Sequence, residues 1–216
     1  NFIMMKKNIL VLLLKMLIFM GLVGQENNEI ILPKPRMQGG KPILTALKER
    51  HTERDFSTKE LSNSVLSDLL WAAYGVNRPE SGKRTAPSAR NKQEIDIYVV
   101  MSKGTYKYDA FNNKLIKIIG SDIREATGMQ PFVKNAPVNI LYIADFDKMG
   151  NDEKMNYVWS AVCAGAICQN IYLFCASEGL ATVVRGLFDS KELSQKLKLK
   201  PNQKIILAQT IGYPMK

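Results

Sequence analysis

The chain has 216 residues, of which 46% are hydrophobic and 23% are charged, with a formal net charge of +10 at pH 7. Length and composition are those of a globular protein of about one domain that can bury a core. The charge would allow binding of nucleic acid or of an anionic ligand. However, the lysines are scattered, and no segment combines them with exposed aromatics in a known nucleic-acid-binding motif. We therefore expect no nucleic-acid partner.

Residues 1–24 have the layout of a secretory signal peptide. Lys6 and Lys7 precede an apolar run, and small residues follow up to Gly24. Lys15 interrupts the run, and Leu22 is large for a position two before a cut after Gly24, so an uncleaved membrane anchor or an over-long start stays open. A working leader implies an exported, periplasmic or membrane-anchored protein; otherwise we expect a cytoplasmic one.

Residues 25–40 form a predicted arm, and residues 41–216 form the predicted domain. The arm, "QENNEIILPKPRMQGG", holds two prolines and a double glycine and has little periodicity, so it could wrap a partner. Ile43, Leu44 and Leu47 then follow helical spacing and predict a short helix. The charged stretch "LKERHTERDF" lies at the end of that helix and contains the only histidine of the chain, His51.

The next segment is predicted to be a capped helix followed by a long loop. "STKE" at residues 57–60 is a capping-box pattern, and an apolar stripe then runs to Ala73 before Gly75. Residues 76–93 are polar and turn-rich, and a loop of this length is often functional. Its "SGKRT" lacks the first glycine of a phosphate loop, which argues against a nucleotide-binding loop of that kind.

The second half alternates strand and helix patterns. The predicted elements are a strand at 94–101, a hairpin at 104–120 turning at Asn112 and Asn113, a strand at 138–145, a long apolar helix at 152–178 closed by Gly179, a strand at 180–188, a short helix capped by residues 189–192, and a strand at 203–214. Together they predict an α+β fold, a three-layer α-β-α sandwich around a mixed or antiparallel sheet. A doubly wound nucleotide fold is the alternative, but no G-x-G-x-x-G lies between a strand and a helix.

Three cysteines, Cys163, Cys168 and Cys175, fall within the long predicted helix. The last two would be roughly 10 Å apart along a helix, too far for a disulfide. Their spacing misses C-x-x-C, and the chain has no second histidine to complete a metal site. We predict that all three are buried apolar residues and that no metal is bound.

Four motifs in order carry a resemblance to a known family: "ERHTERDF", "TAPSARNKQ" leading into a strand, "GLATVVRGL" after the long apolar helix, and a terminal "IGYP". Together they resemble the FMN-dependent nitroreductase family, from about Lys41 to the end of the chain. The resemblance implies the fold above, a homodimer, and FMN as cofactor.

The resemblance gives the charged cluster a function. Arg50, His51 and Thr52 match the residues that hold the 5′-phosphate of FMN, with threonine where the family usually has serine. A forked guanidinium and neutral donors suit a phosphate dianion. Arg54 matches the basic residue at the pyrimidine edge of the flavin, where a fixed cation stabilises the reduced form.

The other matching residues fall in two segments and at the C-terminus. Pro87, Ser88, Ala89 and Asn91 match a loop that approaches the flavin from the other subunit. Val184, Arg185 and Gly186 match the segment whose backbone N–H groups face flavin N5. Family members often continue past the last strand with basic residues that complete the phosphate site, and Lys216 is the candidate substitute here.

The implied activity is two-electron transfer by a ping-pong mechanism. A reduced donor such as NAD(P)H would give electrons to FMN, which would pass them to a nitroaromatic or a quinone. Nicotinamide cofactors are scarce outside the cytoplasm, so export would favour another donor. Two alternatives stay open. One is a flavin-binding or flavin-free scaffold without turnover. The other is a peptide azoline oxidase of the same fold, which the hairpin at 104–120 slightly favours.

Overall fold

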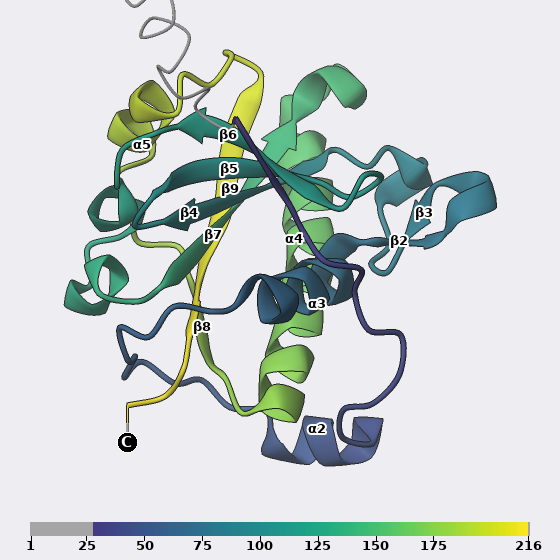
Figure 1. Cartoon of the computed structure of the whole chain (residues 1–216). Coiled ribbons are helices and arrows are strands. Elements are labelled where there is room, and N and C mark those ends of the chain that lie inside the picture. The colour runs from purple at the N-terminus through teal and green to yellow at the C-terminus, as the bar shows by residue number, and fades with distance from the viewer. Residues whose placement is uncertain (1–27, 216) are drawn as a thin grey trace, which may run out of the picture.

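The computed structural model describes residues 28–215, so the predicted leader at 1–24 and the candidate phosphate ligand Lys216 lie outside the described residues. Its centre is a seven-stranded sheet (Figure 1). The strands are β1 (Glu29–Ile31), β4 (Ile95–Met101), β5 (Gly104–Asp109), β6 (Lys114–Ile119), β7 (Val138–Asp145), β8 (Ala181–Arg185) and β9 (Gln203–Gly212). The order is β1-β6-β5-β4-β7-β9-β8. Every neighbouring pair is antiparallel, which confirms the α+β prediction and excludes the doubly wound parallel alternative.

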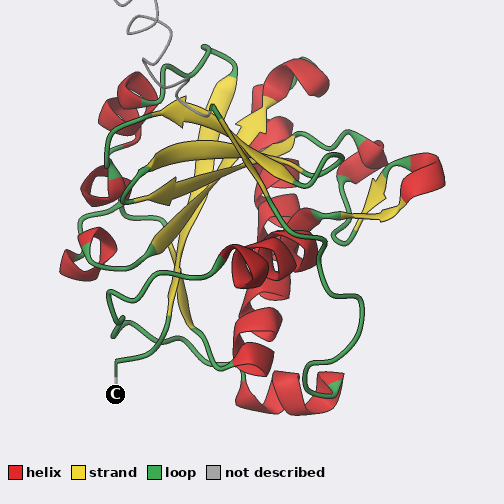
Figure 2. Cartoon of the chain, viewed as in Figure 1, coloured by secondary structure: helices red, strands yellow, loops and turns green. Residues whose placement is uncertain are grey.

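Helices cover both faces of this sheet (Figure 2). Helices α3 (Asn63–Tyr74) and α4 (Glu153–Glu178) lie on one face, and α2 (Ile43–Glu49) packs on α4. Helix α5 (Ser190–Lys196) lies on the opposite face beside the 3-10 turn Arg124–Thr127. Strand β7 shows both layers: Ile140 packs in the core under α3 and α4, and the next residue, Leu141, packs with α5. The apolar run of β7 at residues 140–144 follows from burial on two faces.

Helix α3 begins later than predicted. The capping-box prediction at residues 57–60 is wrong, because Ser62 caps the helix by accepting the Val65 N–H at 3.3 Å. Ser57 instead donates its backbone N–H to the Tyr213 carbonyl at 2.9 Å, and buried Phe56 pairs with Pro214. The bond to Tyr213 takes the Ser57 N–H that Glu60 would accept in a capping box, and the Glu60 carboxylate accepts the Ser102 hydroxyl at 3.1 Å instead. The apolar stripe from Val65 to Ala73 is confirmed as a buried or half-buried face.

Helix α4 has the predicted bounds. The Asp152 side chain accepts the Met155 N–H at 3.1 Å, and Gly179 ends the helix in the left-handed conformation with φ 70°. Its buried side holds the three cysteines, as predicted, and burial raises the pKa of the Cys168 thiol to about 12. By length and hydropathy α4 would suffice to cross a membrane, but one side of it packs on α3, β8 and β9 of the same domain. Within residues 28–215 no cluster of three potential metal ligands occurs.

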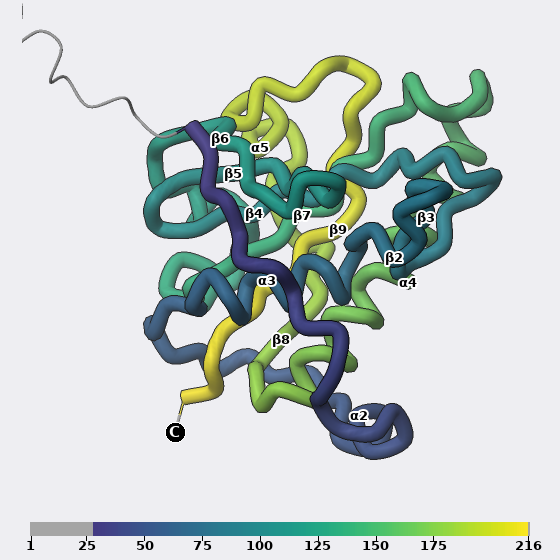
Figure 3. Tube along the Cα trace, turned by 45° about the vertical axis from the view of Figure 1, so that its right-hand side comes forward, coloured from purple at the N-terminus to yellow at the C-terminus, as the bar shows by residue number. Residues whose placement is uncertain are grey.

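The segment predicted as an arm lies along the subunit's own surface. It contributes the edge strand β1, in which Ile30 pairs with Leu115 of β6. Figure 3 shows the arm crossing in front of α3 on its way to α2. Arg36 fastens it there through ion pairs with Asp68 of α3 at 2.5 Å and Glu178 of α4 at 2.8 Å. The sequence pattern did not indicate this strand, because three residues are too few to show a period.

The long loop at 76–93 is partly ordered as a second, two-stranded sheet. Strand β2 (Val76–Arg78) pairs with β3 (Lys83–Arg84), and two 3-10 turns, Pro79–Ser81 and Ala89–Asn91, complete the loop. It projects from the main body at the right of Figure 1. The residues predicted to contact a cofactor, from Pro87 to Asn91, lie between this small sheet and the start of β4.

Candidate functional site

The first motif, residues 50–54, runs along the free edge of β8. Glu53 donates its backbone N–H to the Thr182 carbonyl at 3.1 Å. Further along, Asp55 accepts the backbone N–H of Met215 at 3.1 Å. Because β8 is the last strand of the sheet, its outer edge is open to this segment and to a ligand. The fold thus places the first motif beside the predicted β8 residues.

Tyr172 of α4 connects the first motif with β8. Its hydroxyl lies 3.1 Å from Thr52 Oγ1 and also accepts the Val184 N–H at 3.1 Å. The Arg50 guanidinium lies over its ring, 5.3 Å from the centroid, in a cation–π contact. Sequence reasoning missed this residue, because a tyrosine within an apolar helix shows no pattern that separates it from a core aromatic. In the sequence, only the hydroxyl group of Tyr172 could have indicated a role in the site.

The first motif presents donors and positive charge. Among the described residues, neither Arg50 nor Arg54 has a carboxylate partner. The His51 Nδ1 lies 2.8 Å from the Glu49 carbonyl, and since a carbonyl only accepts, Nδ1 carries the proton. Glu53 is occupied locally: the backbone N–H groups of Asp55 and Arg54 bind its carboxylate and lower its pKa. The motif therefore suits an anion.

The three predicted residues at the end of β8 and just after it have different environments. The Val184 N–H is already bound to Tyr172. The Arg185 side chain turns to the opposite face, 4% exposed, where it donates to Thr210 Oγ1 at 2.9 Å, Thr127 O at 2.7 Å and Asn139 Oδ1 at 3.0 Å. Burial lowers the pKa of Arg185 to about 10. At Gly186 a Cβ would meet no atom within 4 Å, so space is open there.

The loop residues Pro87, Ser88, Ala89 and Asn91 do not join this cluster within one subunit. Ala89 lines a cavity of about 670 Å³ at the other end of α4, together with Met155, Asn156 and Trp159. Asn156 and Tyr172 are 16 residues apart on α4, which is about 24 Å of helix. The predicted site residues thus form two groups, one at each end of α4.

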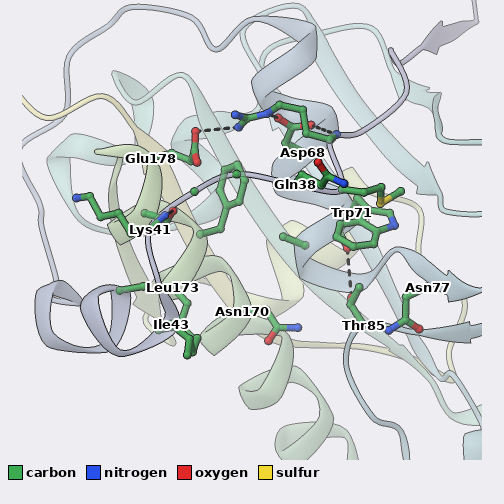
Figure 4. Close-up of a pocket in the computed structure, with 18 residues that line it drawn as sticks. Gln38, Lys41, Ile43, Asp68, Trp71, Asn77, Thr85, Asn170, Leu173 and Glu178 are labelled. Atoms are coloured by element: carbon green, nitrogen blue, oxygen red, sulfur yellow. Dashed lines mark hydrogen bonds and ion pairs between the residues drawn. The ribbon is translucent and has the colours of Figure 1, made fainter.

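A separate cavity of about 450 Å³ lies between the arm, α2, α3 and the C-terminal half of α4 (Figure 4). Trp71 forms part of its wall, and its backbone carbonyl accepts the Thr85 hydroxyl at 3.2 Å. Asn77 and Asn170 add amide groups. None of the predicted site residues lines this cavity.

Known proteins match this chain over most of its length. The model of the nitroreductase family matches residues 47–213. The nitroreductase-like protein MJ1384 of Methanocaldococcus jannaschii is 32% identical over 167 residues, which cover 71% of this chain and 83% of that protein.

Two solved structures share the fold. A nitroreductase-like protein from Ralstonia eutropha JMP134 has a TM-score of 0.84 and 39% identity, over 90% of this chain and 93% of that one. A nitroreductase-like protein from Desulfovibrio desulfuricans, solved in complex with FMN, has a TM-score of 0.60 and 22% identity, over 82% of this chain and 89% of that one.

Proposed function

Because the chain belongs to the nitroreductase family, we propose that it is an FMN-dependent oxidoreductase that works as a homodimer. The observation that carries this proposal is the junction at Tyr172, where one hydroxyl lies between Thr52 of the first motif and the Val184 N–H of β8. Bound FMN would supply the redox chemistry by accepting two electrons from a donor and giving them to an organic acceptor. The residues of the chain bind, orient and electrostatically tune it.

The donor set of the first motif fits the phosphate of FMN. Arg50 is a guanidinium with no carboxylate partner among the described residues, held in place by the Tyr172 ring. Thr52 adds a hydroxyl. The Nδ1–H of His51 is used by the Glu49 carbonyl, so its Nε2 would donate to phosphate only in the doubly protonated ring. A phosphate dianion binds best to such charge-assisted donors. Arg54, exposed four residues further on, is the cation that we assign to the pyrimidine edge of the flavin.

Gly186 is the residue that we assign to flavin N5. The Thr182 carbonyl and the Val184 N–H both point to the outer edge of β8, since they bind Glu53 and Tyr172 there. Alternate residues of a strand share an edge, so the next backbone groups on this side belong to Gly186. Its N–H has no partner among residues 28–215, whereas that of Val184 is occupied. The open space at Gly186 leaves room for a flat ring.

The exposed side of α4 supports the proposed dimer. Met155, Val158 and Val162 follow one another at spacings of three and four residues and are all exposed, so they form an apolar stripe without a cover in the described subunit. Gly165 and Ala161 are exposed as well and allow close approach of a second helix. Residue 164 lies midway between Asn156 and Tyr172. A two-fold axis near it would bring the Pro87–Asn91 loop of one subunit to the first motif of the other.

For the reaction, we propose ping-pong exchange at one open flavin face, with a reduced donor such as NAD(P)H and a nitroaromatic or quinone acceptor. The backbone N–H of Gly186 and the charge of Arg54 would stabilise negative charge on the reduced ring. No acid or nucleophile of the chain is required, which agrees with the single histidine serving in the phosphate motif.

The first test is the colour and mass of the purified protein. We expect a yellow dimer, because the cofactor lies between subunits and the α4 stripe needs a partner surface. Absorbance spectra and light scattering measure both properties. A colourless monomer that does not quench flavin fluorescence on titration with FMN would refute the proposal.

A further inference from the structure

The loop that carries Ser88 and Asn91 has a strained backbone. Arg90, Asn91 and Gln93 have φ angles of 52°, 54° and 48°, in the left-handed region that side chains other than asparagine and glycine rarely adopt. Such a conformation costs of order 1–3 kcal/mol per residue and persists only where surrounding contacts determine it. Arg90 and Gln93, the two that are not asparagine, therefore require a strong local constraint.

Gln93 supplies that constraint with all of its polar groups. Its backbone N–H donates to Ser88 Oγ at 2.9 Å, and its carbonyl accepts from Lys148 Nζ at 3.2 Å. Its side-chain Nε2 donates to the Gly82 carbonyl at 3.0 Å and to Asn91 Oδ1 at 3.1 Å. Its Oε1 accepts from Arg84 Nε at 2.7 Å. Hydrogen bonds of this single residue thus hold the loop from Gly82 to Asn91 in its conformation.

These contacts also fix the direction of every hydrogen bond. An arginine N–H only donates and a backbone carbonyl only accepts, so Arg84 and Gly82 leave one orientation for the Gln93 amide. Gln93 Nε2 then meets the oxygen of Asn91, not its nitrogen. In the same way, the Gln93 N–H occupies an acceptor position on Ser88. The Ser88 hydroxyl faces the buried Tyr74 hydroxyl, so among residues 28–215 what remains is the exposed NH₂ group of Asn91, which is a donor.

We infer that Gln93 is a positioning residue that turns the NH₂ group of Asn91 outward as a donor and so selects a ligand that presents an acceptor atom there. The inference rests on the proposed function, in which the loop meets the flavin of the partner subunit. The carbonyl oxygens and unprotonated nitrogens of the flavin ring are acceptors of this kind. Because FMN and riboflavin share that ring, Gln93 affects both ligands, whereas the proposed phosphate ligands Arg50, His51 and Thr52 affect FMN alone.

The test replaces donors by acceptors without changing shape. Gln93→Glu keeps an oxygen for Arg84 but removes both donations from Nε2, so the contact with the Asn91 oxygen becomes repulsive. We expect the dissociation constants of FMN and riboflavin, measured by quenching of flavin fluorescence, to rise by about tenfold each, the effect of roughly one lost hydrogen bond. Asn91→Asp, which keeps the oxygen near Gln93 and removes the outward NH₂, should raise both constants by a similar factor.

Asn113 provides a matched control. It too is left-handed, with φ 47°, and its amide donates to Pro33 O at 2.7 Å and Ser67 Oγ at 2.9 Å while accepting from the Tyr108 hydroxyl at 3.2 Å. Asn113→Asp makes the same amide-to-acid change in the turn between β5 and β6. It should lower the melting temperature and leave both flavin dissociation constants unchanged.

A double-mutant cycle separates positioning from a general loss of stability. If Gln93 acts through Ser88 and Asn91, then adding Gln93→Glu to Ser88→Ala/Asn91→Ala should change flavin affinity by less than about twofold. Fully additive effects, or a Gln93→Glu protein that binds both flavins like the parent, would overturn the inference while Arg50→Ala still tests the proposed function. A parent that binds neither flavin would overturn the proposed function itself and this inference with it.

Discussion

Arg50 is held for binding by an aromatic ring instead of a carboxylate. Its guanidinium lies 5.3 Å from the centre of the Tyr172 ring. A carboxylate partner would compete with phosphate for the same donors, whereas a ring face leaves the N–H groups in the guanidinium plane free. The arrangement keeps Arg50 ordered and available.

Replacing Arg50 tests the phosphate assignment. Arg50→Ala should weaken FMN binding by about 2–4 kcal/mol, because it removes a charge-assisted contact and leaves the anion partly uncompensated. Riboflavin lacks the phosphate and should bind the parent and the variant about equally. Fluorescence titration with both ligands measures the difference. Equal FMN affinity in the two proteins would show that Arg50 does not bind the phosphate.

Replacing Arg54 tests electrostatic tuning. Arg54→Gln can still donate a hydrogen bond but supplies no fixed charge, so FMN should stay bound. A loss of about 1.5–3 kcal/mol of interaction with the reduced flavin corresponds to a reduction potential lower by roughly 30–65 mV. A redox titration against a dye of known potential measures the shift, with occupancy checked in both proteins. An unchanged potential at full occupancy would place Arg54 on the solvated end of the motif only.

At this scale the sequence indicates which residues bear charge and hydroxyl groups, but not how they are supported. The motif from Arg50 to Arg54 stands out as a charged cluster, and in the structure its Glu53 lies beside Thr182 of β8. Tyr172 and Gln93 carry no such mark, because their roles depend on contacts with Thr52, Val184 and Gly82 that arise only in the fold. The direction of the Arg185 side chain likewise depends on strand register.

Among the elements, prediction succeeded where local pattern and tertiary packing agree. Helix α4 is long and apolar and has both a capping aspartate and a left-handed glycine, so its bounds follow from the sequence. The start of α3 does not, because pairing of Phe56 with Pro214 overrides a valid capping pattern. Strand β1 was missed because it is short and is defined only by its partner β6.

The exposed stripe of α4 should be the dimer contact. Val162 is 59% exposed in the described subunit, and in a two-fold interface its replacement acts twice. Val162→Glu should convert the dimer to monomers at micromolar concentration and lower FMN retention, since charge repulsion and desolvation both oppose association. Sedimentation velocity and flavin absorbance measure the two effects.

Ile118→Glu on β6 is the matched control. Ile118 is also an exposed aliphatic residue, at 40%, but it lies on the far part of the sheet from α4. This variant should stay dimeric and yellow. A Val162→Glu protein that remains a dimer with full flavin would move the interface to another surface.

In the proposed dimer, each α4 helix carries one half of a flavin site at one end and the other kind of half at its other end. The end near Tyr172 bears the first motif, and the end near Asn156 bears the cavity lined by Ala89, Met155 and Trp159. Neither half is complete alone, because about 24 Å of helix separates them. An antiparallel pair of α4 helices would complete both sites at once, so flavin binding and dimer formation should be coupled.

Mixing two defective proteins tests this sharing directly. Arg50→Ala damages the phosphate half, and Ser88→Ala/Asn91→Ala damages the loop half, so each homodimer should bind FMN weakly at both of its sites. In a mixed dimer, one site receives both damaged parts. The other site receives the intact Arg50 of one subunit and the intact loop of its partner, so it is restored. Random exchange makes about half of the dimers mixed, so about one quarter of all sites should regain parental affinity. Co-refolding followed by FMN titration measures this fraction. If each subunit held its own flavin, mixing would restore none, and the Pro87–Asn91 loop would have to serve a function within its own subunit.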